Sequence, residues 1–243
     1  MLLRTPNDAT VATPGSGGRF TAAIFDMDGL LLDSERVILE AWQQTAREFG
    51  AELKREGYLE LIGRRGADVR ALLVSLLPDG FPLETARPRV QEIVAERRAR
   101  EGFVVKPGVR ALLARLAESG VACAVASSTR REEVERRLTL TELHAHFSVL
   151  VGGDEVEHGK PAPDIFLLAA ARLAIPPAQC IVFEDIEHGA RAAVTAGMQV
   201  VIVPDLKPPS AEAQAFSLAV LPSLELVLGT FAAWFLAGSN ADR

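Results

Sequence analysis

The sequence predicts an α/β protein with a doubly wound parallel sheet, and three observations point to it. Short apolar runs without strict alternation recur along the chain, which is typical of strands covered on both faces. Helical patterns separate most of these runs, and this alternation produces right-handed crossovers within one sheet. One long block between the first two runs contains helical patterns only. The predicted architecture is therefore a Rossmann-like core with an inserted all-helical cap.

The predicted strands share Val, Ile or Ala and are bounded by polar residues or Gly. They span residues 20–25, 121–126, 147–151, 180–183 and 200–203, with a weaker sixth at 218–221. The core helices between them have apolar residues at helical spacing, in ranges 108–120, 132–140, 163–173 and 187–196. The late apolar stretch 226–237 is shorter than the ~20 residues that a bilayer requires, so we expect a packed helix there.

The block without strands defines the predicted domains. Its helical patterns cover residues 37–49, 57–63, 67–77 and 84–100. We predict a helical cap over 35–103 and a catalytic core from 19–34 and 104–243, with Pro107-Gly108 marking the return to the core. Residues 1–18 are rich in Gly, Pro and small polar side chains, which predicts a disordered tail.

Composition excludes some classes of function. The 243 residues are 49% hydrophobic, enough for a buried core, and the formal net charge is -6. A negative surface argues against general nucleic-acid binding, which needs a basic face. Cys123 and Cys180 lie in apolar runs and are expected to be buried thiols. With no leader pattern or membrane span, we expect a cytoplasmic protein that acts on a small molecule, with a monomer as the default.

Polar residues follow the predicted strands where ligands of open parallel sheets bind. They are Asp26-Met27-Asp28-Gly29, Ser127-Ser128-Thr129, Gly159-Lys160-Pro161 and Glu184-Asp185. Crowded carboxylates repel one another, and a hard cation such as Mg²⁺ would hold them together. Hydroxyl and ammonium groups suit phosphate oxygens, while one carboxylate can attack phosphorus and another can protonate the leaving oxygen. These residue types together indicate phosphoryl transfer.

This set of motifs resembles the haloacid dehalogenase-like superfamily over essentially the whole chain after the tail. The Asp-x-Asp-Gly run, the Ser after the second strand, the Lys of Gly-Lys-Pro and the Glu-Asp pair look like its four motifs. Asp33-Ser34-Glu35 and the run from Gly159 to Asp164 look like its beta-phosphoglucomutase and phosphatase branch. The resemblance implies an aspartyl-phosphate intermediate and a Mg²⁺ cofactor.

The resemblance also implies a role for each motif residue. Asp26 is the expected nucleophile, Asp28 the general acid and base, Ser127 a phosphoryl ligand and Lys160 the group that offsets negative charge. The expected metal ligands are Asp26, the backbone carbonyl of Asp28, Glu184 and Asp185.

Substrate contacts are expected from both domains. Gly29 permits the tight turn after the first strand, and Ser128 follows the second motif. In the cap, Arg64 or Arg65 could reach a distal phosphate or hydroxyl of the substrate. Other interpretations stay open: Ser127 or Ser128 could cap a helix, Glu184 could lie behind the ligands, and both cap arginines could be solvated.

Two cap positions favour a phosphatase over a mutase. The beta-phosphoglucomutase pattern has a His shortly before a Trp in the first cap helix, where this chain has Ile38 and Trp42, and an Arg where Gly66 stands. We therefore predict Mg²⁺-dependent hydrolysis of a small phosphate ester such as a sugar phosphate. A sugar-phosphate mutase and a non-catalytic protein that binds a phosphometabolite are the alternatives. The second Asp of the first motif argues against a dehalogenase.

Overall fold

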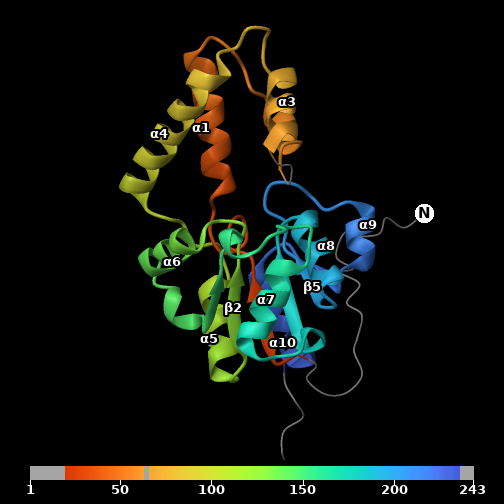
Figure 1. Ribbon diagram of the computed structural model, residues 1–243. Helices are drawn as coiled ribbons and strands as arrows, with labels where there is room; N and C mark the ends of the chain where they lie inside the picture. Colours follow the sequence, from red (N-terminus) through yellow and green to blue (C-terminus); the bar gives the residue numbers. More distant parts are fainter. Residues whose placement is uncertain (1–19, 63–65, 236–243) are drawn as a thin grey trace, which may run out of the picture.

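A computed structural model provides the structure and describes residues 20–62 and 66–235. Its centre is a six-stranded sheet in the order β3-β2-β1-β4-β5-β6, with every neighbouring pair parallel (Figure 1). The strands are β1 (Ala22–Phe25), β2 (Ala122–Ala126), β3 (Val149–Val151), β4 (Cys180–Glu184), β5 (Gln199–Ile202) and β6 (Ala219–Val220). Every predicted run forms a strand, and the predicted doubly wound sheet is confirmed.

Helices cover both faces of this sheet because its strands carry apolar side chains on both sides. The core helices are α5 (Val109–Glu118), α6 (Arg131–Leu140), α7 (Asp164–Leu173), α8 (Glu187–Thr195), α9 (Ala211–Phe216) and α10 (Val227–Phe235). Alternate residues of β1 enter different apolar layers. Ala23 and Phe25 pack in the layer with α5, α6 and α10, whereas Ala22 and Ile24 pack in the layer with α7 and α8.

The block inserted after β1 has its own apolar cluster. Its helices are α1 (Glu35–Glu48), α2 (Arg55–Leu59), α3 (Gly66–Leu76) and α4 (Leu83–Glu101). Their buried side chains, including Leu39, Tyr58 and Ile93, share no member with the two clusters of the sheet. Figure 1 shows α1, α3 and α4 standing apart from the sheet, on the side of α6 and α8. The boundaries 34/35 and 103/104 stay predictions.

The two linkers between this block and the sheet run side by side. The Asp33 amide donates to the Val104 carbonyl at 2.9 Å, and the Lys106 amide donates to the Leu31 carbonyl at 2.9 Å. Leu32 and Val105 form an antiparallel bridge between these bonds. The point where the chain leaves the core is therefore also the point where it returns.

Local patterns explain the differences from the expected helices. The predicted helix at 57–63 is shorter, since past Leu59 the amides of Glu60 and Leu61 donate to carbonyls three residues back and tighten the chain into turns. Helix α9 was not predicted, although the Ser210 hydroxyl accepts from the Ala213 amide as an N-cap.

Both cysteines are buried, as expected. The predicted tail, 1–18, lies outside the described residues, and no described helix could span a membrane.

Candidate active site

A buried ammonium joins three strand ends. Asp26 directly follows β1, and its amide donates to the Phe183 carbonyl at 3.0 Å, which fixes it beside β4. Lys160 is 4% exposed, and its Nζ lies 2.5 Å from Asp26 Oδ1 and 2.5 Å from Glu184 Oε1. It also donates to the Ala126 carbonyl at the end of β2, at 3.0 Å. Lys160 of the third motif therefore contacts both Asp26 of the first motif and Glu184 of the fourth.

The two acids after β4 complete a cluster of carboxylates. Glu184 is fully buried, and its Oε2 accepts from the Asp185 amide at 3.1 Å. One carboxylate oxygen each from Asp26, Glu184 and Asp185 lies within 4.8 Å of the others. Gly189 makes room for this arrangement, because a Cβ there would lie 1.8 Å from Glu184 Oε1. The predicted metal ligands other than the Asp28 carbonyl are therefore brought together.

The electrostatics of this cluster favour an additional cation. Burial raises the pKa of Asp26 to about 7, although Lys160 opposes the shift. Burial and the neighbouring carboxylates likewise raise the pKa of Asp185. Burial alone would lower the pKa of Lys160, but Asp26 and Glu184 outweigh it and raise that pKa above its usual value. One ammonium faces three buried carboxylates, so a divalent cation with oxygen ligands fits the charge and the donor set.

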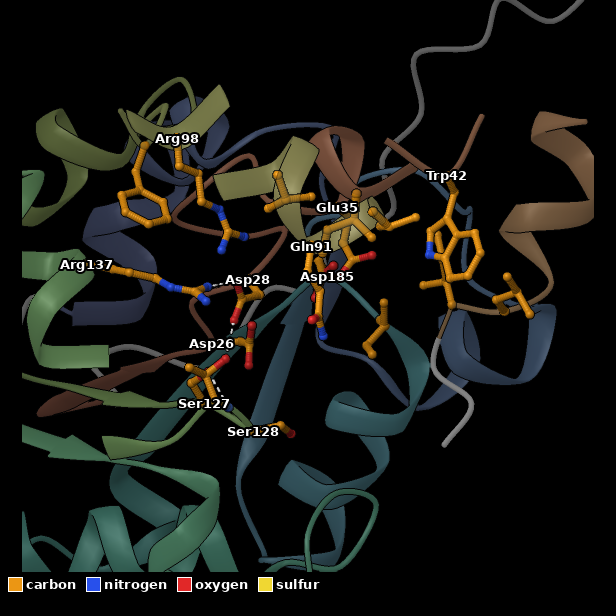
Figure 2. A pocket seen from close by; sticks show the side chains of 18 of the residues that line it. Asp26, Asp28, Glu35, Trp42, Gln91, Arg98, Ser127, Ser128, Arg137 and Asp185 are labelled. Carbon is orange, nitrogen blue, oxygen red and sulfur yellow. Dashed lines mark hydrogen bonds and ion pairs between the residues drawn. The ribbon is translucent and has the colours of Figure 1, made fainter. Parts of the chain in front are cut away.

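Asp28 lies beside this cluster and is held by two core residues. The Thr129 hydroxyl donates to its Oδ2 at 2.8 Å, and Arg137 on α6 donates to its Oδ1 at 2.7 Å. Figure 2 shows both carboxyl groups, Asp26 and Asp28, on the same side of the pocket. Two oriented hydrogen bonds restrict the rotamers of Asp28, which a residue that transfers protons at a defined position requires.

The second motif forms a turn rather than a helix cap. Ser127 is 1% exposed, and its amide donates to the Val151 carbonyl at 3.0 Å. Its hydroxyl accepts from the Thr129 amide at 3.1 Å, whereas the N-cap of α6 is Arg130. Ser128 is exposed and lines the pocket. These contacts leave the Ser127 hydroxyl hydrogen available to an oxygen acceptor.

Gly29 has a conformation and a neighbour that other residues do not tolerate. Its φ is +82°, and a Cβ would lie 2.2 Å from Asp185 Oδ2. The first motif therefore passes directly over the fourth, and its glycine is needed for this close approach. The expected contact between Gly29 and a substrate stays a prediction.

A pocket of about 1440 Å³ opens above these residues and extends between the sheet and the cap helices. Its lining includes Asp26, Ser127 and Asp185 from the core and Ile38 from the cap. Figure 2 shows Trp42 on the cap side of the same pocket. The predicted cap contacts Arg64 and Arg65 lie outside the described residues.

Several polar pocket residues were not assigned to substrate or catalysis from the sequence. Among them are Glu35, Arg98, Thr129 and Arg137. Arg137 carried a signal, because it lies next to the inward-facing Leu138 and three residues after the inward-facing Val134 on one helix. Burial raises the pKa of Glu35 to about 7, with Asp28 and Asp205 adding to the effect. Glu35 is only partly exposed at the start of α1, and the sequence did not predict these surroundings.

Comparison with known proteins identifies the family of this chain. The sequence model of haloacid dehalogenase-like hydrolases matches residues 23–203. The phosphorylated carbohydrates phosphatase of Thermotoga maritima is 35% identical over 178 residues, covering 73% of this chain and 82% of the relative. The fructose-1-phosphate phosphatase YqaB of Escherichia coli is 31% identical over 186 residues, covering 76% of this chain and 97% of the relative.

A solved structure has the same fold. The crystal structure of a putative beta-phosphoglucomutase from Thermotoga maritima superposes with a TM-score of 0.72 at 31% identity, covering 87% of this chain and 98% of that one. The expected fold and family are both confirmed. The chain belongs to the haloacid dehalogenase-like hydrolases, and within them it is a phosphoric monoester hydrolase.

Proposed function

We propose that this enzyme hydrolyses the phosphate ester of a small metabolite, most simply a phosphorylated carbohydrate, through an aspartyl-phosphate on Asp26. The observation that carries the proposal is the buried contact of Lys160 with both Asp26 and Glu184, at 2.5 Å each, beside the oriented Asp28. Relatives named as phosphatases of phosphorylated carbohydrates, fructose 1-phosphate and hexitol phosphates support this substrate class.

Each core residue has a role in the proposed reaction. The Asp26 carboxylate attacks phosphorus in line with the leaving oxygen, and Asp28 donates a proton to that oxygen as the bond breaks. Ser127 donates a hydrogen bond to the transferring group, and the Lys160 ammonium offsets its negative charge. In the second half, Asp28 accepts a proton from water, which attacks phosphorus and releases Asp26 and inorganic phosphate.

The proposed cofactor is Mg²⁺, held by the carboxylates of Asp26, Glu184 and Asp185 and by the Asp28 carbonyl. The buried acidic cluster supports this choice, since its carboxylates exceed the single ammonium among them. When bound, the ion would neutralise charge on the transferring oxygens. The cap helices would then limit the access of water to the pocket that they cover.

Ile38 supports hydrolysis over mutase chemistry. Its side chain lines the pocket where the mutase pattern has a His, and an alkyl group moves no proton. Incubation with beta-glucose 1-phosphate and a trace of the bisphosphate separates the two activities. Free phosphate should appear faster than glucose 6-phosphate, and the reverse order would establish the mutase.

A phosphate-release screen tests the proposal as a whole. Sugar phosphates, nucleotides and glycolate-type esters would be assayed with Mg²⁺, with EDTA, and with Mg²⁺ restored after EDTA. We expect turnover of at least one ester that EDTA abolishes and Mg²⁺ restores. Activity that persists through thorough chelation would count against the metal site. Failure on every ester would favour a non-catalytic protein that binds a phosphometabolite.

A further inference from the structure

Three guanidinium groups surround one aromatic ring at the boundary between cap and core. The ring belongs to Phe103, in the linker that returns from the cap. The guanidinium carbons of Arg98, Arg136 and Arg137 lie 5.1, 5.5 and 5.4 Å from its centroid. Arg98 comes from cap helix α4, whereas the other two come from core helix α6. All four side chains line the pocket above Asp28.

Two of these cations have anionic partners and one does not. Glu133 pairs with Arg136 and Arg137, at 2.6 and 2.7 Å, and Asp28 pairs with Arg137 at 2.7 Å. Arg98 has no carboxylate within 4.0 Å among residues 20–62 and 66–235. Arg98 therefore has no direct ion pair: the carboxylates of Asp28, Glu133 and Glu35 act on it only at longer range, and Arg137 repels it.

The surroundings of Arg98 suit an additional anion. The side chain is partly buried, and burial, with repulsion from Arg137, lowers its pKa. Figure 2 shows the Arg98 guanidinium directed toward Arg137 and Asp28. A partly buried guanidinium beside a second cation is suited to bind a carboxylate or a phosphate, to which it can donate two parallel hydrogen bonds.

We propose that Arg98, supported by Arg137, binds a second anionic group on the alcohol portion of the substrate. This inference rests on the proposed function, in which Asp28 protonates the leaving oxygen. The leaving alcohol must then lie beside Asp28, where Arg98 is directed. The preferred substrate is therefore a phosphate ester that also carries a carboxylate or a second phosphate, and Arg98 determines this specificity.

Matched substrates test the inference. Glycerol 3-phosphate and 3-phosphoglycerate differ by a hydroxymethyl and a carboxylate group, and fructose 1-phosphate and fructose 1,6-bisphosphate differ by a phosphate. Wild type would be compared with Arg98→Met, which retains an unbranched apolar side chain, and with Arg98→Lys. Arg100→Met is the control, because its side chain is on the same helix, 72% exposed and outside the pocket.

We expect Arg98→Met to lower kcat/KM for the member that carries the second anionic group, in at least one pair, by roughly ten- to a hundred-fold, the range of a lost charge-assisted hydrogen bond. The partner without that second group should change less than about threefold, as should every substrate of Arg100→Met. Arg98→Lys should recover part of the loss. The responding pair identifies the anion as carboxylate or phosphate. An equal loss for both members of each pair, or no loss at all, would overturn the inference.

Failure of the proposed function is distinguishable from failure of this inference. If wild type releases phosphate from no ester, calorimetric titration with the same four compounds decides the question. Tighter binding of an anion-bearing compound that disappears in Arg98→Met would sustain the subsite without the chemistry. Equal or undetectable affinity for both members of each pair would overturn it.

Discussion

The sheet and the cap helices of this protein are built from apolar clusters that share no residue, and they differ in what they contribute to the pocket. The strand ends supply charged groups that are almost fully buried and fixed by hydrogen bonds to backbone, such as Lys160 and Glu184. The α1–α4 block supplies partly exposed side chains such as Ile38 and Arg98. The difference teaches that the charged groups at the strand ends are held rigidly, whereas the cap contributes side chains with more freedom to move.

Loss of the proposed nucleophile should produce the largest effect. Asp26→Asn removes the attacking oxygen charge, so we expect phosphate release to fall by about 10³-fold or more, while circular dichroism stays that of wild type. Asp79→Asn, an exposed carboxylate of the cap, is the matched control and should retain full activity. A folded Asp26→Asn protein with a near-normal rate would remove the core of the proposed mechanism.

The independence of the two clusters can be tested with a pair of buried leucines. Leu39 in α1 and Leu112 in α5 are 1% and 0% exposed, and neither lines the pocket. Each change to Ala should lower the free energy of unfolding by about 2–5 kcal/mol. Hydrogen exchange should accelerate only in α1–α4 for Leu39→Ala, but in β1 and β2 for Leu112→Ala. Equal acceleration in β1 for both variants would show one cooperative unit.

A change at Gly189, which makes room for the Glu184 carboxylate, should have a smaller effect, on the affinity for metal. In Gly189→Ala, the new methyl would overlap the Glu184 carboxylate and displace it, so the half-saturating Mg²⁺ concentration for activity should rise about 10–100-fold. Gly229→Ala is the control, since a Cβ there meets nothing within 4 Å. Unchanged Mg²⁺ dependence in a folded Gly189→Ala protein would argue against Glu184 as a metal ligand.

The same comparison explains what the sequence could predict. The strands and motifs of the core were readable because continuous apolar runs end at charged residues, and parallel strands bring those ends together. The expectation that the residues of these motifs lie close together is confirmed for Asp26, Lys160, Glu184 and Asp185. Their catalytic and metal-binding roles stay predictions.

The residues of the pocket walls were harder to predict from the sequence, for a physical reason. Arg98 belongs to a helix rich in arginines, and its sequence does not show which of them faces inward. The contact between Arg137 and Asp28 joins residues 109 positions apart, so it depends on how α6 packs against the loop after β1. The sequence did not indicate that position 189 must be Gly. The need for Gly arises only because the Glu184 carboxylate lies against it in the folded protein.

Glu35, at the start of α1, should show the smallest of these effects, a change in stability with pH at the boundary between sheet and cap. Its pKa is raised from 4.5 to about 7, first by burial and then by Asp28 and Asp205. Below pH ~4.5 the carboxyl is protonated in both folded and unfolded chains, so no free energy of unfolding is lost. As pH rises toward 7 the unfolded chain loses its proton first, which lowers the stability of the metal-free protein.

Glu35→Gln removes this titration and should therefore be more stable than wild type at pH 8, by about 1–3 kcal/mol, and equal to it near pH 4.5. Urea unfolding in EDTA at the two pH values measures the difference. Glu56→Gln, an exposed position in α2, is the control and should show no such dependence on pH. If Glu35→Gln were instead less stable at pH 8, the folded protein would favour the charged carboxylate, and the entry to the cap would be more solvated than its burial indicates.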